Sequence, residues 1–196
     1  MNQTSNASVL MIVDMINGFV KEGPLADPTI CSIIKPIDKI IKDFKQKDYP
    51  IVALCDAHQE NSKEFNAFLP HCIKGTKESE LIDEFKIYQD TIKIIEKNSV
   101  NGFLSPEFQQ WFEKQPVYKN YVVVGCVTDI CVLNMASSLM AYIHQHNLDA
   151  NVLVSKDTSE TFEIGNHPRE SFNYMAYTLL EQLGVIVTDH VKLNQL

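Results

Sequence analysis

The stretch YVVVGCVTDICV, residues 121–132, decides the fold because it joins a buried strand to the start of a helix. Its first five residues show no polar alternation, which is typical of a strand covered on both faces of a parallel sheet. From residue 129 to 146 the spacing of apolar residues predicts a helix. Cys126 therefore ends the predicted strand, whereas Cys131 lies in the first turn of the predicted helix.

Similar apolar segments recur along the chain and alternate with helical patterns. The predicted strands cover residues 8–13, 50–56, 91–97, 121–125, 150–157 and 184–189. The predicted helices cover residues 29–47, 78–87, 105–114, 129–146 and 167–183. Strands that alternate with helices are joined by right-handed crossovers and form a parallel sheet. We therefore predict an α/β fold, a three-layer α/β/α sandwich with a six-stranded, mainly parallel sheet, formed by residues 1–196 as a single domain.

Composition and charge exclude several classes of function. The net charge is -8 without a compensating basic stripe, which argues against a nucleic-acid-binding surface. No apolar run approaches the roughly 20 residues needed to cross a bilayer, and the polar residues 1–8 do not resemble a signal peptide. Five cysteines without a small-domain spacing predict reduced thiols, so we expect a cytoplasmic protein.

Chemically active side chains follow the predicted strands at their carboxyl ends, where parallel sheets place their ligand sites. Asp14 follows the first strand, Asp56 and His58 follow the second, and Lys97 ends the third. Each has a common structural explanation taken alone, because an aspartate often caps a helix and a lysine is usually solvated. We expect them to converge with residues 125–131 on one crevice.

An acid, an amine and a thiol in one crevice can perform nucleophilic catalysis. We expect the pKa of Cys131 to be lowered by the helix N-terminus and by the charge of Lys97. Asp14 can accept the thiol proton and return it to a leaving amine. Backbone N–H groups in the turn after Gly125 can stabilise a developing oxyanion. Cys126, at the end of the strand, is expected to be structural.

The segment after the second strand carries a separate signal. Asp56, His58, Glu64 and His71 provide only oxygen and nitrogen donors, which suit a divalent ion such as Zn²⁺, Mn²⁺ or Fe²⁺. From spacing alone, a set of scattered surface residues is an equally good explanation. Cys72 could add a soft ligand, but we expect it to be buried.

The combination of GCVTDICV, DAH and FLPHCIKGT with Asp14, Lys97 and Cys131 resembles the isochorismatase-like cysteine hydrolases, and within them the nicotinamidases. The resemblance covers essentially the whole chain in the right order. It implies that Asp14, Lys97 and Cys131 form a catalytic triad. It also implies a metal cofactor, zinc first with manganese or iron as alternatives, bound by Asp56, His58, Glu64 and His71.

The resemblance also implies the geometry of the reacting centre. A cis peptide is implied between Cys126 and Val127, and the N–H groups of Val127 and Cys131 are implied to form the oxyanion hole. Phe19 and Phe68 fall where the family sandwiches a pyridine ring, although core packing is the alternative for both. Homo-oligomers are common in this family, and the implied partner is a small amide substrate.

One departure from the family pattern concerns the substrate. After Lys97 the family commonly has Tyr-Ser-Ala-Phe, whereas this chain has KNSVNGF, with Val100 at the place of the tyrosine. The leading hypothesis is a metal-dependent nicotinamidase that hydrolyses nicotinamide to nicotinate and ammonia through a Cys131 thioester. The alternative is a related cysteine amidohydrolase acting on another small amide or carbamoyl compound. A non-catalytic binding protein is disfavoured because every member of the triad is present.

Overall fold

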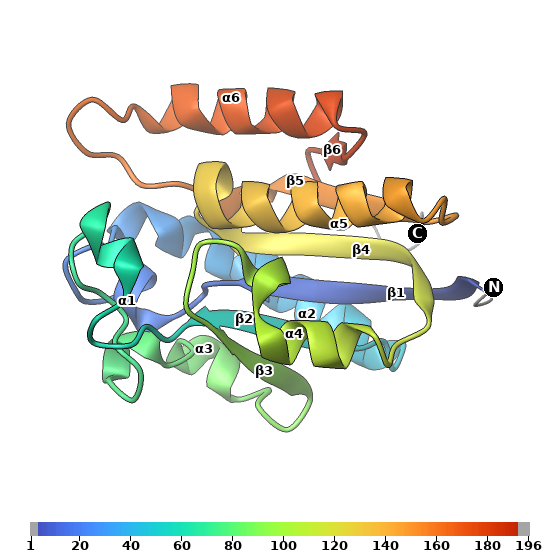
Figure 1. Ribbon diagram of the computed structural model, residues 1–196, viewed down its shortest axis with the longest axis horizontal. Coiled ribbons are helices and arrows are strands. Elements are labelled where there is room, and N and C mark those ends of the chain that lie inside the picture. The colour runs from blue at the N-terminus through green and yellow to red at the C-terminus, as the bar shows by residue number, and fades with distance from the viewer. Residues whose placement is uncertain (1–3, 192–196) are drawn as a thin grey trace.

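The computed structural model describes residues 4–191, and its sheet has the strand order β3-β2-β1-β4-β5-β6 (Figure 1). The strands are β1 (Thr4–Val13), β2 (Ile51–Asp56), β3 (Ile92–Lys97), β4 (Val117–Cys126), β5 (Asn151–Glu160) and β6 (Ile186–Thr188). All neighbouring strands of the described sheet pair in parallel. The predicted parallel sheet is thus confirmed. The predicted domain and its polar N-terminal segment both include residues 1–3, which, like 192–196, lie outside the described residues.

Helices cover both faces of the sheet and give the three layers expected. The helices are α1 (Asn17–Val20), α2 (Ile34–Gln46), α3 (Asp83–Lys86), α4 (Pro106–Phe112), α5 (Leu133–Gln145) and α6 (Arg169–Gln182). In Figure 1, α4 and α5 pass in front of the sheet and α2 lies behind it. Within residues 4–191, no helix has both the length and the apolar character that a membrane crossing requires.

Side chains of β1 alternate between two apolar cores, one on each face of the sheet. Leu10 and Ile12 pack in the core under α2 and α3, whereas Met11 and Val13 pack in the core under α4, α5 and α6. All four are buried. In a strand that is buried on both faces, apolar and polar residues do not alternate, because neither face meets solvent. This explains the continuous apolar runs in the sequence.

The predicted helix over residues 78–87 is wrong as a continuous element. The chain instead forms a 3₁₀ turn, Lys77–Ser79, and the short helix α3. Between them the backbone is extended and bonds to the loop after β1, with Ile82 N–H donating to the Met15 carbonyl at 3.1 Å. Tertiary hydrogen bonds have therefore replaced the helical ones that the local pattern favours.

The sheet places the ends of four strands around one point. Strands β2 and β3 continue to one side of β1, and β5 and β6 continue to the far side of β4, so the strand order reverses between β1 and β4. Gly125 has a φ of +118°, and a Cβ there would lie 2.0 Å from the Val13 carbonyl oxygen. Only glycine permits this close approach. Ligand sites of open parallel sheets lie at such reversal points.

Candidate active site

The structure brings Asp14, Lys97 and Cys131 together at the reversal point between β1 and β4. All three residues are buried. The Lys97 Nζ lies 2.8 Å from Asp14 Oδ2 and 3.9 Å from the Cys131 sulfur. Asp14 adopts a left-handed conformation, φ 51°, directly after β1, and its Oδ1 accepts a hydrogen bond from the Asp56 N–H at 2.9 Å. The expectation that neighbouring strand ends deliver these side chains to one place is confirmed.

The protonation states around Cys131 depend on one buried lysine, Lys97, which lies between two carboxylates. Burial acts to lower the pKa of Lys97, but Asp14 and Asp56 outweigh it and raise that pKa well above its ordinary value. The Nζ to Asp56 Oδ1 distance is 2.5 Å. Burial and the neighbouring Asp56 charge raise the pKa of Asp14 to about 6. Lys97 is therefore a fixed ammonium, and Asp14 is a carboxylate of unusually high basicity.

The predicted lowering of the Cys131 pKa is wrong. Burial raises the pKa of this thiol well above its ordinary value, and the Lys97 charge offsets only part of that effect. Burial is the main reason, and the negative charges of Asp14 and Asp56, which pair with Lys97, also act to raise this pKa and so oppose the effect of the ammonium. The thiol is protonated at rest, so it needs a base. The Asp14 carboxylate oxygen and the Cys131 sulfur lie within 4.8 Å of each other.

The two cysteines that bracket the turn after β4 have different surroundings. Cys126 is buried, and its thiol donates to the Asp14 carbonyl at 3.0 Å, so it supports the turn after β1. The peptide between Cys126 and Val127 is cis, as the resemblance implied. A short π-helix, Thr128–Val132, follows and carries Cys131. Both Val127 and Cys131 line a cavity beside this turn.

Beside these groups lie four side chains with metal-ligand chemistry. Asp56, His58, Glu64 and His71 each offer a ligand atom, and these atoms lie within 4.8 Å of one another. His58 Nε2 is 3.5 Å from Asp56 Oδ1 and 3.6 Å from Glu64 Oε1, and His71 Nε2 is 3.9 Å from Asp56 Oδ2. The alternative of scattered surface residues is wrong, because only Glu64 is not fully buried.

The Nδ1 atoms of His58 and His71 contact oxygen atoms outside this group. The Nε2 lone pair of each ring therefore faces the other candidate ligand atoms. His71 Nδ1 lies 2.7 Å from the Leu69 carbonyl, which can only accept, so the proton is on Nδ1. His58 Nδ1 faces Asn98 Oδ1 at 3.2 Å, and that oxygen also accepts the Gln59 N–H. His58 Nε2 is buried without a hydrogen-bond partner. Metal-bound histidines have such supports, so the group fits a divalent metal ion.

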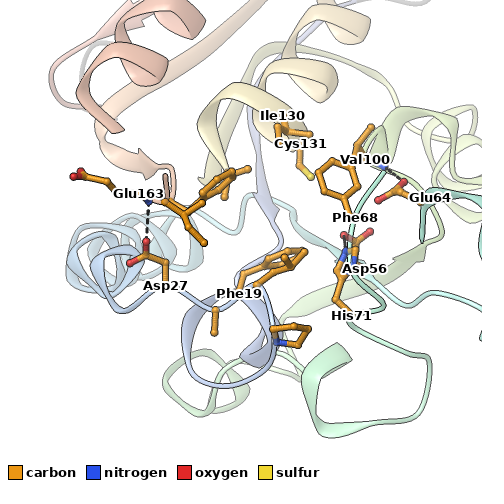
Figure 2. Close-up of a pocket in the computed structure, with 16 residues that line it drawn as sticks. Phe19, Asp27, Asp56, Glu64, Phe68, His71, Val100, Ile130, Cys131 and Glu163 are labelled. Carbon is orange, nitrogen blue, oxygen red and sulfur yellow. Dashed lines mark hydrogen bonds and ion pairs between the residues drawn. The ribbon is translucent and has the colours of Figure 1, made fainter. Parts of the chain in front are cut away.

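A cavity of about 180 Å³ opens onto both groups (Figure 2). Phe19, Phe68, Val100 and Cys131 all line it. Phe19 and Phe68 each meet the His71 ring edge-on, with centroids 5.5 Å and 6.2 Å away. Figure 2 shows Asp56, Glu64 and His71 on one side of the cavity and Asp27 and Glu163 on the opposite side. A small planar molecule in this space would contact the Cys131 thiol, the aromatic rings and the His71 imidazole.

Val100, where the sequence departs from the family pattern, has two roles in the structure. Its side chain lines the cavity, and its backbone N–H donates to Glu64 Oε2 at 2.9 Å (Figure 2). The backbone contact orients a candidate metal ligand whatever the side chain is. The departure therefore changes the cavity wall and leaves the support of Glu64 in place.

Several residues of the site were missed by sequence reasoning. Asn98, which supports His58, directly follows Lys97 at the end of β3, so the strand-end rule could have found it. The segment after β5 contributes Phe162 and Ile164 to the cavity wall, and the same rule applied to the fifth strand would have included it. The contribution of Leu25, in the loop after α1, has no comparable signal in the sequence.

Comparisons with known proteins bear on the family and the fold of the chain. The family model described as the isochorismatase domain matches residues 8–191. Nicotinamidase 1 of Arabidopsis thaliana is 34% identical over an alignment of 152 residues. The match covers 69% of this chain and 61% of the length of that relative.

Two solved structures share the fold. The N-carbamoylsarcosine amidase from Thermoplasma acidophilum superposes with a TM-score of 0.77 at 24% identity, over 95% of this chain and 99% of that one. The pyrazinamidase of Pyrococcus horikoshii in complex with zinc superposes with a TM-score of 0.72 at 22% identity, over 92% and 98%.

Proposed function

Because the chain belongs to the isochorismatase family, we propose that it is a metal-dependent nicotinamidase that hydrolyses nicotinamide to nicotinate and ammonia. The observation that carries the proposal is that a thiol, an ammonium and a carboxylate lie together beside a four-residue nitrogen and oxygen group, and that one cavity reaches members of both groups. The similarity to Nicotinamidase 1 supports the choice of substrate. A non-catalytic role would leave this buried charged cluster, which is costly to bury, without a purpose.

The proposed reaction begins with proton transfer from Cys131 to Asp14. The sulfur then forms a bond to the amide carbonyl carbon and gives a tetrahedral intermediate. Asp14 returns the proton to the amide nitrogen, the carbon–nitrogen bond breaks, and ammonia leaves a thioester on Cys131. Water, deprotonated by Asp14, attacks the thioester and releases nicotinate, and the proton returns to the sulfur. A base with a pKa of about 6 is ionised at neutral pH and suits both proton transfers.

Two groups would stabilise negative charge during these steps. We assign the oxyanion hole to the backbone N–H groups of Val127 and Cys131, which lie on the two sides of the turn that lines the cavity. Lys97 holds Asp14 and Asp56 in place and keeps a positive charge near the sulfur. Removal of either contribution would raise the barrier to the first step.

The proposed metal ligands are Asp56, His58, Glu64 and His71. Two imidazoles and two carboxylates suit zinc, with manganese or iron as alternatives. When bound, the ion would act as a Lewis acid that accepts the pyridine nitrogen as a ligand. Phe19 and Phe68 would flank the ring, so the amide carbon would be oriented toward the sulfur of Cys131.

A second candidate is a cysteine amidohydrolase that acts on another small amide or carbamoyl compound. The observation that favours it is Val100, whose side chain lines the cavity where the family has a tyrosine. A smaller and apolar side chain there leaves room for a substituent on the substrate. The groups around Cys131 are the same in both candidates.

The cellular setting is also proposed. All five cysteines are free, which fits the reducing environment of the cytoplasm. The substrate is a small molecule, consistent with a cavity of about 180 Å³. A homo-oligomer stays a prediction.

The test is an ammonia-release screen with metal content measured on the same sample. Nicotinamide, ring-methylated nicotinamides, benzamide and N-carbamoyl amino acids are the substrates to compare. We expect turnover of nicotinamide, loss of activity to the background level in Cys131→Ala, and about one divalent ion per chain. Turnover of a different amide with nicotinamide inert would select the second candidate. Ammonia release that persists in Cys131→Ala would exclude the thioester.

A further inference from the structure

A second polar cluster connects the turn of Cys131 to the segment after β5. Asp129 lies in the π-helix, between the two residues assigned to the oxyanion hole. Its Oδ1 accepts the Thr161 hydroxyl at 2.5 Å, and its Oδ2 is 2.8 Å from His167 Nε2. Both carboxylate oxygens are thus bound to a single segment, residues 161–167. The side chains of Asp129 and His167 are only 12% and 14% exposed.

His167 is fixed in orientation by contacts on both nitrogens and both ring faces. Its Nδ1 lies 3.0 Å from the Phe162 carbonyl, which can only accept, so Nδ1 carries a proton. The ring stacks on Phe162 with centroids 4.0 Å apart and on Phe172 with centroids 3.6 Å apart. Such a side chain has lost most of its rotational freedom, and it connects the turn rigidly to the segment.

The segment 161–167 contributes one wall of the cavity through three of its residues. Phe162, Glu163 and Ile164 line it, and Glu163 N–H donates to Asp27 Oδ2 at 2.9 Å (Figure 2). The wall is therefore attached at one side to the loop before α2 and at the other side to the turn of Cys131. Neither Asp129 nor His167 lines the cavity itself.

We propose that Asp129 and His167 are positioning residues that hold this wall in register with the turn that carries Val127 and Cys131. One bound substrate molecule must contact this wall and, at the same time, present its carbonyl carbon to the sulfur of Cys131. Displacements of about 1 Å between binding and reacting groups reduce catalysis by up to a hundredfold. The inference rests on the proposed function for the identity of the substrate, while the connection itself is independent of it.

Three variants separate the hydrogen bond from the stacking and from the charge. His167→Phe keeps a ring between the two phenylalanines but removes the donor to Asp129. Asp129→Ala removes both acceptors. Asp129→Asn keeps an acceptor for Thr161, and its amide can donate to Nε2 of a neutral ring that keeps its proton on Nδ1, so a hydrogen bond remains after the carboxylate charge is removed.

His190→Ala is the matched control. It breaks another histidine–aspartate contact of 2.8 Å, with Asp157, and neither residue lines the cavity. An effect caused by the loss of any histidine–aspartate contact, whatever its position, would therefore also appear in His190→Ala. Thermal melts of each variant verify that it is folded before the kinetics are compared.

Steady-state kinetics with nicotinamide give the first readout. We expect His167→Phe and Asp129→Ala to lower kcat/KM by about tenfold or more, with both a lower kcat and a higher KM. Asp129→Asn should recover most of the activity, to within about threefold of the parent protein. His190→Ala should match the parent protein. Equal impairment by Asp129→Asn and Asp129→Ala, or unchanged kinetics in His167→Phe, would overturn the proposal.

Amide hydrogen exchange gives a second readout that needs no substrate. In His167→Phe and Asp129→Ala, exchange should accelerate in residues 161–167 and also in residues 128–132, because the contact joins the two segments. Acceleration confined to residues 161–167 would show that the turn is held without the pair, and the proposal would fail. If the parent protein does not hydrolyse nicotinamide, the proposed function fails while this exchange measurement still decides the inference.

Discussion

Lys97 shows how a single buried charge organises the reacting centre. Its ammonium lies 2.8 Å from Asp14 and 2.5 Å from Asp56, and all three side chains are at most 1% exposed. Burying three charges is costly, and their mutual attraction offsets the cost only while all are present. Lys97 is therefore both a structural requirement and a source of the field around Cys131.

Replacing Lys97 by methionine tests this dependence. In the metal-free protein, Lys97→Met leaves two carboxylates buried beside each other, so we expect the free energy of unfolding to fall by about 3–5 kcal/mol. Urea denaturation measures the change. Lys74→Met is the control, because Lys74 pairs with Glu96 on the surface, where both side chains are about half exposed, and such pairs contribute about 0–1 kcal/mol. An equal loss in both variants would contradict the interpretation.

At this scale the sequence predicts which residues meet, but not their protonation. Asp14, Lys97 and Cys131 could be selected because strand ends converge in a parallel sheet. The Cys131 pKa was predicted in the wrong direction, since burial and the pairing of Lys97 depend on packing that no local pattern records. Asp129 and His167 were not selected, because their contact joins segments 38 residues apart and follows from the shape of the loop after β5.

Where the prediction of an element rests on apolar periodicity, the structure agrees with it. Where tertiary contacts determine the element, the structure differs from the prediction. The buried face of α2, formed by Ile37, Ile40, Ile41 and Phe44, has the predicted helical spacing. The predicted helix before β3 shortens to α3 because the preceding backbone bonds to the loop after β1. The helix after β4 starts as a π-helix at Thr128, a local geometry that apolar spacing does not distinguish from an α-helix.

The contact between α2 and the end of α3 is suited to a test of pH dependence. The Tyr88 hydroxyl donates to Asp38 Oδ1 at 2.5 Å, and the Lys42 ammonium lies 2.6 Å from Oδ2. Burial acts to raise the pKa of Asp38, but the hydrogen bonds from Lys42 and Tyr88 outweigh it and lower that pKa below its ordinary value. The ionised form of Asp38 is therefore the one that stabilises the folded protein.

Tyr88→Phe should lower the free energy of unfolding by about 1 kcal/mol at pH 7. Because the folded pKa is depressed, the stabilisation is present above the unfolded pKa of about 3.9 and is lost as the pH falls through the folded value. The difference between Tyr88→Phe and the parent protein should therefore shrink below about pH 4 in urea titrations. Tyr174→Phe, at a position that is 71% exposed, is the control and should have no effect. A difference that grows on acidification would refute the argument.

At the scale of the whole molecule, the candidate metal ligands come from the sheet and from a long loop. Asp56 ends β2, whereas Glu64, in the 3₁₀ helix Lys63–Asn66, and His71 lie in the long segment between β2 and β3. A bound ion would tie that segment to the sheet and would favour the folded state by mass action. The cavity wall formed by Phe68 belongs to the same segment.

Removal of the metal should therefore lower thermal stability. At a hundredfold excess of free ion over Kd, binding contributes about 2.7 kcal/mol. For a chain of this size that corresponds to roughly 5–10 °C in Tm. Calorimetry with and without a chelator measures the shift, and zinc added back should restore it. His71→Ala should be insensitive to the chelator. A Tm that is the same in both conditions would show that no ion stabilises the parent protein.

The alternation of strands and helices was sufficient to predict the class and the layers of the fold. It does not specify which strands are neighbours, because that depends on pairings between distant segments. The pairing of β1 with β4 is such a case, and it creates the reversal point on which the site depends.

That pairing has a consequence for synthesis. Ser8 of β1 and Asn120 of β4 are hydrogen-bonded neighbours separated by 112 residues. At about 5–20 residues per second, a ribosome needs roughly 6–20 s to make the intervening chain. During that time β2 can cover one edge of β1, but the other edge is unpaired and apolar. The nascent chain therefore passes through an aggregation-prone stage, and the reacting centre is assembled only after β4 has emerged.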